Sequence, residues 1–181
     1  MLERLTQAAR ETVVLAECDA RELGSDQIGA DHLLLALASA SGDPVGRLLA
    51  EAGLDEQAVR SYLAGRAQAG PFDDDDAAAL RTLGIDVEVV IARLGELEPG
   101  QEPRPTNNRR GRLRMSRGAR ATLQHAVHEA MTQRSRQIGT DHLLLGLLRS
   151  GDPDVAELLT TAGTDPDRLR LAVLSSRGSA A

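Results

Sequence analysis

The segment Ile28-Gly-Ala-Asp-His-Leu-Leu-Leu-Ala-Leu37 occurs a second time, as Ile138-Gly-Thr-Asp-His-Leu-Leu-Leu-Gly-Leu147. Ile28 corresponds to Ile138, and every later position of the segment keeps the same offset. From Asp31 onward the first copy is too apolar to be exposed and lacks the alternation of a strand, so it predicts a short buried helix. Because the flanking residues repeat as well, we expect the chain to consist of two similar halves.

Helical patterns surround each copy of this segment. Small and apolar residues recur every three or four positions over residues 6–23, which predicts an amphipathic helix with Thr6 as its N-cap. Asp43, which precedes a proline, and Asp55 are expected to cap two further helices. One repeat is therefore predicted to contain four helices, and the same pattern returns between Ser116 and about residue 173.

The whole chain divides into four parts. We predict a first repeat at residues 1–64, an insert at 65–112, a second repeat at 113–176 and a disordered tail at 177–181. The two repeats are expected to pack as one all-α domain in a pseudo-twofold arrangement.

The insert carries a partial echo of the repeat. Leu80 takes the place of Leu49, and the leucines and valines that follow keep the same spacing. This pattern predicts two more helices, at about residues 73–83 and 86–97. Residues 99–111 are rich in proline, asparagine and arginine, which is typical of a mobile, basic linker.

The composition excludes several kinds of chemistry. Aromatic residues make up 1% of the chain, which favours close helix packing of Leu, Val, Ile and Ala. All 21 basic residues are arginines, so a lysine Schiff base or general base is impossible, and no phosphate-binding Gly-x-x-x-x-Gly-Lys motif is present. No set of catalytic or metal-ligating residues stands out. We therefore expect no enzymatic activity, no cofactor and no metal site.

The cysteine content and the apolar runs indicate the cellular compartment. The single Cys18 excludes an intramolecular disulfide and is expected to be a small residue on a helix. The chain is charged from its third residue, and no apolar run approaches the roughly 18 residues that span a bilayer. We expect a cytoplasmic protein without a membrane partner.

These patterns resemble the Clp N-terminal repeat domain, the module that precedes the ATPase rings of ClpA- and ClpC-type unfoldases. The opening helix of the family begins with a Thr-x-x-Ala pattern, for which Thr6 with Ala9 and Ser116 with Ala119 stand here. The doubled Ile-Gly-x-Asp-His-Leu-Leu-Leu segment is similar to the family's Ile-Gly-Thr-Glu-His motif.

The resemblance covers residues 1–63 and 113–175 and includes no ATPase ring. It implies a free-standing, non-catalytic protein-interaction module whose partners are the Clp unfoldase, its adaptors or degradation substrates. Such a module is not expected to unfold proteins by itself.

The resemblance also implies a ligand, the phosphorylated arginine side chain of tagged substrates. A hydroxyl and a carboxylate hold this group in the family, and the matching residues here are Thr6 with Asp31 and Ser116 with Asp141. A carboxylate pairs with a guanidinium through two N–H donors, while a hydroxyl and free N–H groups at a helix start hold phosphate. Both carboxylates are Asp where the family has Glu, so they could instead simply occupy the first turn of a helix, where negative charge is favoured.

The two copies differ just before the aspartate. Thr140 is expected to cap its helix, whereas Ala30 has no side-chain oxygen for that purpose. If only one site is functional, this difference favours the one at Asp141.

Two other functions remain as alternatives. The cyclic-peptide antibiotics of the family bind near aromatic residues, at places where this chain has the apolar candidates Leu2, Leu5 and Met115. The first alternative is thus a decoy that sequesters such peptide-like molecules. The second is a nucleic-acid binder that uses the arginines from Arg104 to Arg120, although the net charge of −6 and the missing aromatics favour a solvated linker there.

The four histidines are expected to be structural or solvated. His32 and His142 follow the two aspartates at helix starts, where we expect structural hydrogen bonds. His125 and His128 lie three residues apart, but the spacing supplies no third and fourth zinc ligand.

Overall fold

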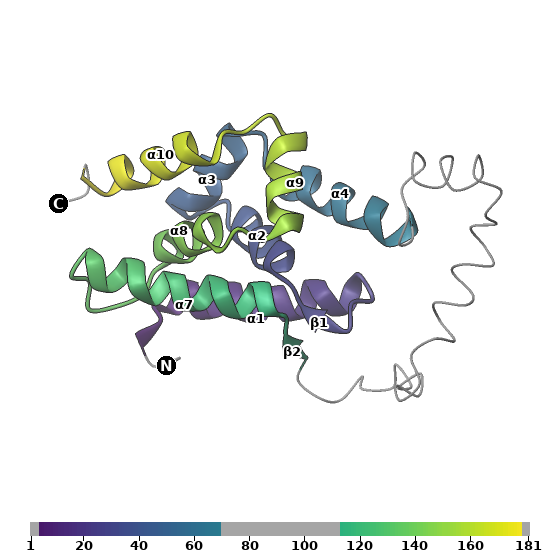
Figure 1. Ribbon diagram of the computed structural model, residues 1–181, viewed down its shortest axis with the longest axis horizontal. Helices are drawn as coiled ribbons and strands as arrows, with labels where there is room; N and C mark the ends of the chain where they lie inside the picture. The colour runs from purple at the N-terminus through teal and green to yellow at the C-terminus, as the bar shows by residue number, and fades with distance from the viewer. Residues whose placement is uncertain (1–3, 70–112, 179–181) are drawn as a thin grey trace. The chain divides into compact units, whose positions relative to one another are not determined.

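The computed structural model describes residues 4–69 and 113–178. Within these ranges the chain forms eight helices and two short strands (Figure 1). The helices are α1 (Gln7–Glu22), α2 (Ala30–Ser39), α3 (Pro44–Glu51), α4 (Glu56–Ala69), α7 (Arg117–Thr132), α8 (Thr140–Ser150), α9 (Pro153–Thr161) and α10 (Pro166–Gly178), and the strands are β1 (Gln27–Ile28) and β2 (Arg114–Met115). The predicted all-α class with two four-helix repeats is confirmed. The helices predicted at residues 73–83 and 86–97 lie outside the described residues.

Local caps start the helices where the sequence predicts. The hydroxyl of Thr6 accepts the N–H of Ala9 at 3.2 Å, and the hydroxyl of Ser116 accepts the N–H of Ala119 at 3.1 Å. The carboxylate of Asp43 caps α3 in the same way. Each such cap contributes about 1 kcal/mol, so short-range sequence determines where these helices begin.

The two copies of the repeated segment, α2 and α8, form the centre of the fold. Their leucines over residues 33–37 and 143–147 are at most 2% exposed. Figure 1 shows both helices between α1 and α7 below and α3, α9 and α10 above, and each contacts helices of both repeats. The two repeats therefore share one hydrophobic core.

No single described helix could cross a membrane by its length and composition, although the bent pair of α2 and α3 passes that test together.

Two short parallel backbone pairings join the repeats. In the first, β1 pairs with β2, so that Ile28 lies opposite Met115. In the second, Leu5 lies opposite Ile138. Met115 corresponds to Leu5 and Ile138 to Ile28, so the two pairings are equivalent under the pseudo-twofold relation. The sequence analysis did not predict these strands, because a two-residue pairing leaves no alternating pattern to detect.

Candidate functional site

The backbone pairings bring each N-cap hydroxyl to the motif of the other repeat. The N–H of Thr6 donates to the carbonyl of Ile138 at 3.0 Å, and the N–H of Ser116 donates to the carbonyl of Ile28 at 2.9 Å. The start of α1 therefore lies beside the start of α8, and the start of α7 lies beside the start of α2.

This arrangement corrects the grouping expected from the sequence. That grouping joined Thr6 to Asp31 and Ser116 to Asp141, each within one repeat. It does not hold because α1 has 16 residues, which separate its two ends by about 24 Å, and the contact of Ser25 with His32 places Asp31 near the end opposite Thr6. We call the region of Thr6 and Asp141 site I, and the region of Ser116 and Asp31 site II.

In site II, three segments meet at the start of α7. A Cβ atom added to Gly118 would collide with the carboxylate of Asp152 and would lie 3.5 Å from the Cβ of Ala30. Burial raises the pKa of Asp152, and the negative charges of Asp154 and Asp31 raise it further. Site II thus holds a partly desolvated carboxylate near a second one, beside Gly118, which has no side chain.

Site I contains a hydroxyl group, on Thr140, that site II lacks. The Oγ1 of Thr140 donates to Asp43, with distances of 3.0 Å to Oδ2 and 3.1 Å to Oδ1. Thr140 is the first residue of α8 and Gly139 is the N-cap, so Thr140 does not cap its helix as the sequence suggested. Ala30 holds the equivalent place in site II and offers no donor to Asp152. Only in site I does this hydroxyl stabilise the carboxylate.

The histidine after each aspartate belongs to the capping of its helix. The Nδ1 of His32 accepts the N–H of Gly29 at 3.1 Å, and its Nε2 lies 3.1 Å from the hydroxyl of Ser25. The Oδ1 of Asp31 lies 2.8 Å from the same Nδ1, but that nitrogen already accepts the hydrogen bond from Gly29 and has no N–H to donate, so this contact is not a salt bridge. His142 makes the same bond to the N-cap of α8. The predicted structural role of both histidines is confirmed.

The two aspartates themselves lie at the rim of the sites. Asp31 and Asp141 are in the first turns of α2 and α8, and their side chains are 14% and 22% exposed. Negative charge is favoured there by the helix dipole. Both aspartates therefore occupy the first turn of a helix, as the alternative interpretation of the sequence expects. Their side chains are also partly exposed, so a ligand could reach each carboxylate.

The described positions of the apolar and basic candidates give little support to the two alternative functions. Leu5 is 5% exposed and packs in the core, so it is not the surface residue that the decoy alternative requires. Met115 is half-buried in β2, and Leu2 lies outside the described residues. Of the basic stretch, residues 104–112 also lie outside the described residues. The remaining arginines are exposed, namely Arg114, Arg117 and Arg120.

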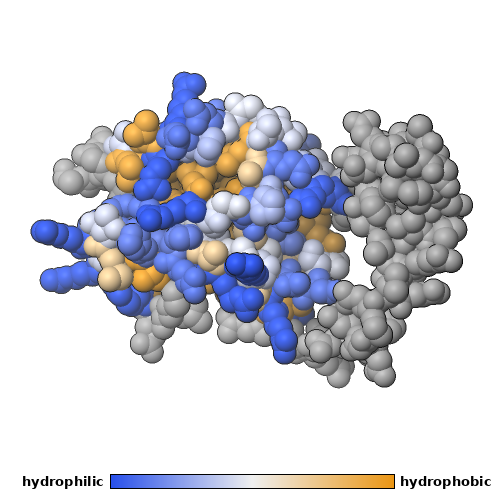
Figure 2. Space-filling view, viewed as in Figure 1, coloured by the Kyte–Doolittle hydropathy of each residue, from blue (hydrophilic) through white to orange (hydrophobic). Residues whose placement is uncertain are grey.

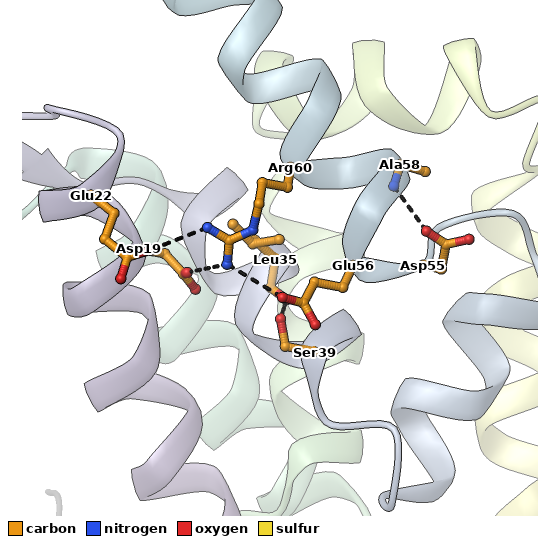
Figure 3. A network of polar contacts seen from close by, with 8 residues as sticks. All are labelled: Asp19, Glu22, Leu35, Ser39, Asp55, Glu56, Ala58 and Arg60. Carbon is orange, nitrogen blue, oxygen red and sulfur yellow. Dashed lines mark hydrogen bonds and ion pairs between the residues drawn. The ribbon is translucent and has the colours of Figure 1, made fainter.

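The structure contains two buried carboxylates that the sequence analysis missed. Asp19 in α1 is 1% exposed, and the Nη2 of Arg60 donates to its Oδ1 at 2.8 Å (Figure 3). Glu129 is the equivalent residue in α7, and it accepts from Arg170 at 2.9 Å and from Arg149 at 3.3 Å. The sequence did contain a signal for these two residues, because each is a charged residue on the apolar face of a predicted helix. These ion pairs tie the first helix of each repeat to its last.

The two buried carboxylates have opposite electrostatic environments. Burial raises the pKa of Asp19, and the hydrogen bond and charge of Arg60 offset only part of that increase. Burial also disfavours the ionised form of Glu129, but the hydrogen bonds from Arg170 and Arg149 outweigh it and lower the pKa. The second repeat therefore holds its buried charge more favourably than the first.

Sites I and II offer charge recognition. In each, a carboxylate lies near the start of a helix, which suits a ligand that carries a cationic and an anionic group together. Within residues 4–69 and 113–178, no group of three or more His, Cys, Asp or Glu side chains is arranged to hold a metal ion.

Comparison with known sequences shows the family to which the chain is similar. The model of the family described as Clp repeat (R) N-terminal domain matches residues 4–97, 72–162 and 114–179. The chloroplastic chaperone protein ClpC1 of Oryza sativa subsp. japonica is 26% identical over 178 residues, which cover 98% of this chain and 16% of that protein. The chloroplastic chaperone protein ClpC of Pisum sativum is 26% identical over 181 residues, with 100% and 16% covered. The chain thus spans about a sixth of these relatives.

Solved structures share the fold. The N-terminal domain of the chaperone ClpD from Arabidopsis thaliana superposes with a TM-score of 0.69 at 20% identity, covering 98% of this chain and 97% of that chain. The Hsp104 N-terminal domain from Candida albicans gives a TM-score of 0.63 at 20% identity, with 97% and 92% covered. Together with the doubled motif at the centre of the fold, the matches show that this chain belongs to the Clp repeat (R) N-terminal domain family.

Proposed function

We propose that the chain is a protein-interaction module without catalytic activity, which binds adaptors, degradation substrates or the Clp unfoldase itself. Within that role, sites I and II receive arginine side chains that carry a phosphate group. The observation that carries the proposal is the cross-repeat pairing, which joins Thr6 to the motif of Asp141 and Ser116 to the motif of Asp31. Each site thereby combines a helix start for phosphate with a carboxylate for the guanidinium.

The two sites should differ in affinity. In site II, Asp152 is partly desolvated, lies near Asp31 and has no threonine hydroxyl beside it. A guanidinium would relieve the repulsion between these two carboxylates, whereas the hydroxyl of Thr140 already stabilises Asp43 in site I. We therefore propose site II as the stronger site, in place of the site at Asp141.

Calorimetric titration with phosphoarginine tests the site assignment. Asp31→Ala should weaken binding by about tenfold or more, and Asp141→Ala should weaken it less. Glu157→Ala is a matched control, because Glu157 is an exposed carboxylate on α9 outside both sites. Unmodified arginine and inorganic phosphate should each bind more weakly than the combined group.

Two experiments test the site assignment and the general interaction role independently. Unchanged affinity in the Asp31→Ala/Asp141→Ala double variant would refute the site assignment. Co-purification from the source cell tests the role itself, and recovery of neither a Clp component nor a client protein would refute it.

A further inference from the structure

The outer faces of α1 and α10 carry exposed apolar side chains. On α1, Val14 is 59% exposed and Leu15 is 38% exposed. On α10, Leu171 is 64% exposed and Leu174 is 38% exposed. Single exposed leucines are ordinary, but here each helix presents two apolar neighbours on its outer side. Figure 2 shows hydrophobic side chains gathered where Figure 1 places α10.

The internal duplication indicates that the fold does not need these residues. At the equivalent positions of the other repeat, the chain has polar or small residues: Gln124 for Val14, His125 for Leu15, Ser61 for Leu171 and Ala64 for Leu174. Helices α7 and α4 form in the same architecture with these residues. Core packing therefore does not account for the apolar faces of α1 and α10.

The face of α1 forms a shallow groove with a volume of about 450 Å³. Its lining combines apolar and charged side chains, namely Gln7, Arg10, Glu11, Val14, Leu15 and Cys18. Among the described residues Arg10 makes no ion pair, so its positive charge is available to an occupant. A suitable occupant is an amphipathic helix with apolar residues about one turn apart and an acidic residue before them.

Helix α10 has that pattern, and we propose that α10 of a second copy of this chain docks in the groove of α1. Asp167, Leu171 and Leu174 follow one another at steps of four and three and so share one face. When the two helices run parallel, three facing pairs are complementary in one register: Asp167 with Arg10, Arg168 with Glu11, and Leu171 with Val14. In the same register Leu174 falls opposite Glu17 and next to Cys18.

The contact forms between molecules in a head-to-tail manner. Figure 1 shows α10 and α1 on opposite sides of the layer that contains α2 and α8, so the two faces of one molecule do not meet. Because the two docking faces are different, each pair of subunits retains one free α1 groove and one free α10 face. Such heterologous contacts lead to rings or open chains rather than closed dimers.

Sedimentation velocity from low micromolar to submillimolar concentration tests the contact. The mean mass of the native chain should rise with concentration. Two variants take their residues from the sister repeat, V14Q/L15H and L171S/L174A, and each should stay monomeric. An equimolar mixture should form a dimer, because the first variant retains its α10 face and the second retains its α1 groove. Circular dichroism should show the same helix content in all samples.

Charge exchange provides a second test that leaves the apolar residues in place. Arg10→Asp should weaken association by about tenfold, and Asp167→Arg in the same chain should restore it. A native chain that stays monomeric at submillimolar concentration overturns the proposal. So does a mixture of V14Q/L15H and L171S/L174A that forms no dimer. A dimer of L171S/L174A alone would point to a symmetric contact between α1 helices and would likewise overturn it.

Discussion

The hydroxyl of Thr140 in the second repeat donates to the carboxylate of Asp43 in the first repeat, at 3.0 and 3.1 Å. Thr140 is 7% exposed, so this bond lies in a partly desolvated place between the repeats. Ala30 takes the place of Thr140 beside Asp152. One molecule therefore contains the same contact with and without its hydrogen bond.

Replacing Thr140 with valine should lower the free energy of unfolding by about 1–2 kcal/mol, because valine keeps the shape but removes the donor to Asp43. Urea unfolding at neutral pH measures this loss. Thr140→Ser keeps a hydroxyl and should cost less. The converse change, Ala30→Thr, should raise stability by up to about 1 kcal/mol by giving Asp152 the missing donor. Equal stability of Thr140→Val and Thr140→Ser would show that the bond contributes nothing.

A close helix crossing predicts a second stability difference between the repeats. A Cβ atom at Gly146 in α8 would lie 2.5 Å from the nitrogen of Ala126 and 2.5 Å from the carbonyl oxygen of Thr122. Gly146→Ala should therefore destabilise the protein by about 1–3 kcal/mol, although alanine is the better helix former. The equivalent residue in α2 is Ala36, so Ala36→Gly is the matched change and should cost about 1 kcal/mol. Thermal unfolding would contradict the close crossing if Gly146→Ala raised the melting temperature.

The parts of the fold that could be predicted from the sequence depend on short-range interactions. The caps at Thr6 and Asp43 act on residues within one turn, and the buried character of α2 follows from its own composition. The pairing of Thr6 with Ile138 could not be predicted in this way. It arises because the two repeats pack around a pseudo-twofold relation, and no local pattern encodes which motif lies beside which helix start.

The candidate site was predicted only in part, because its residues come from both repeats. The duplicated motif identified Asp31 and Asp141, but their partners came from the other repeat. The role of Thr140 was also missed, since its hydroxyl reaches Asp43, which is 97 positions away in the sequence.

The buried Glu129 predicts a dependence of stability on pH. Burial opposes its ionisation, but Arg170 and Arg149 outweigh that effect and lower the pKa below the usual 4.5. Its ionised form therefore stabilises the fold above about pH 4.5, and this contribution is lost as the pH falls through the lowered pKa. Glu129→Gln should reduce the free energy of unfolding at pH 7 by about 1–2 kcal/mol, since both arginines are partly exposed.

The same substitution should make the acid limb of the stability curve shallower, because one group that protonates in acid has been removed. Urea unfolding at pH 7, 5, 4 and 3 measures both effects. Arg168→Gln is a suitable control, because Arg168 is an exposed arginine of α10 outside the Glu129 cluster. An acid limb that is as steep in Glu129→Gln as in the native chain would mean that this ion cluster does not control acid stability.

The first repeat should respond to pH in the opposite direction. Burial raises the pKa of Asp19 above its usual 3.8, so protonation of this group adds stability as the pH falls through the raised value. Within the described residues, the buried Oδ2 of Asp19 has no hydrogen-bond partner. Ser39 stands where the second repeat has Arg149, and its hydroxyl donates to the carbonyl of Leu35 at 3.0 Å (Figure 3). The first repeat thus lacks the second guanidinium.

Transplanting the second cluster should reverse this behaviour. The double variant Asp19→Glu/Ser39→Arg places two arginines on one buried glutamate, as Arg170 and Arg149 do on Glu129. It should be more stable than the native chain at pH 7 by about 1 kcal/mol, because the unpaired carboxylate oxygen gains a donor. The gain should disappear as the pH falls below about 4.5, where the glutamate protonates. Asp19→Glu alone lacks the added guanidinium and should show little of the gain. If the double variant were no more stable than Asp19→Glu at pH 7, the introduced arginine would not reach the carboxylate and the two repeats would not be interchangeable at this position.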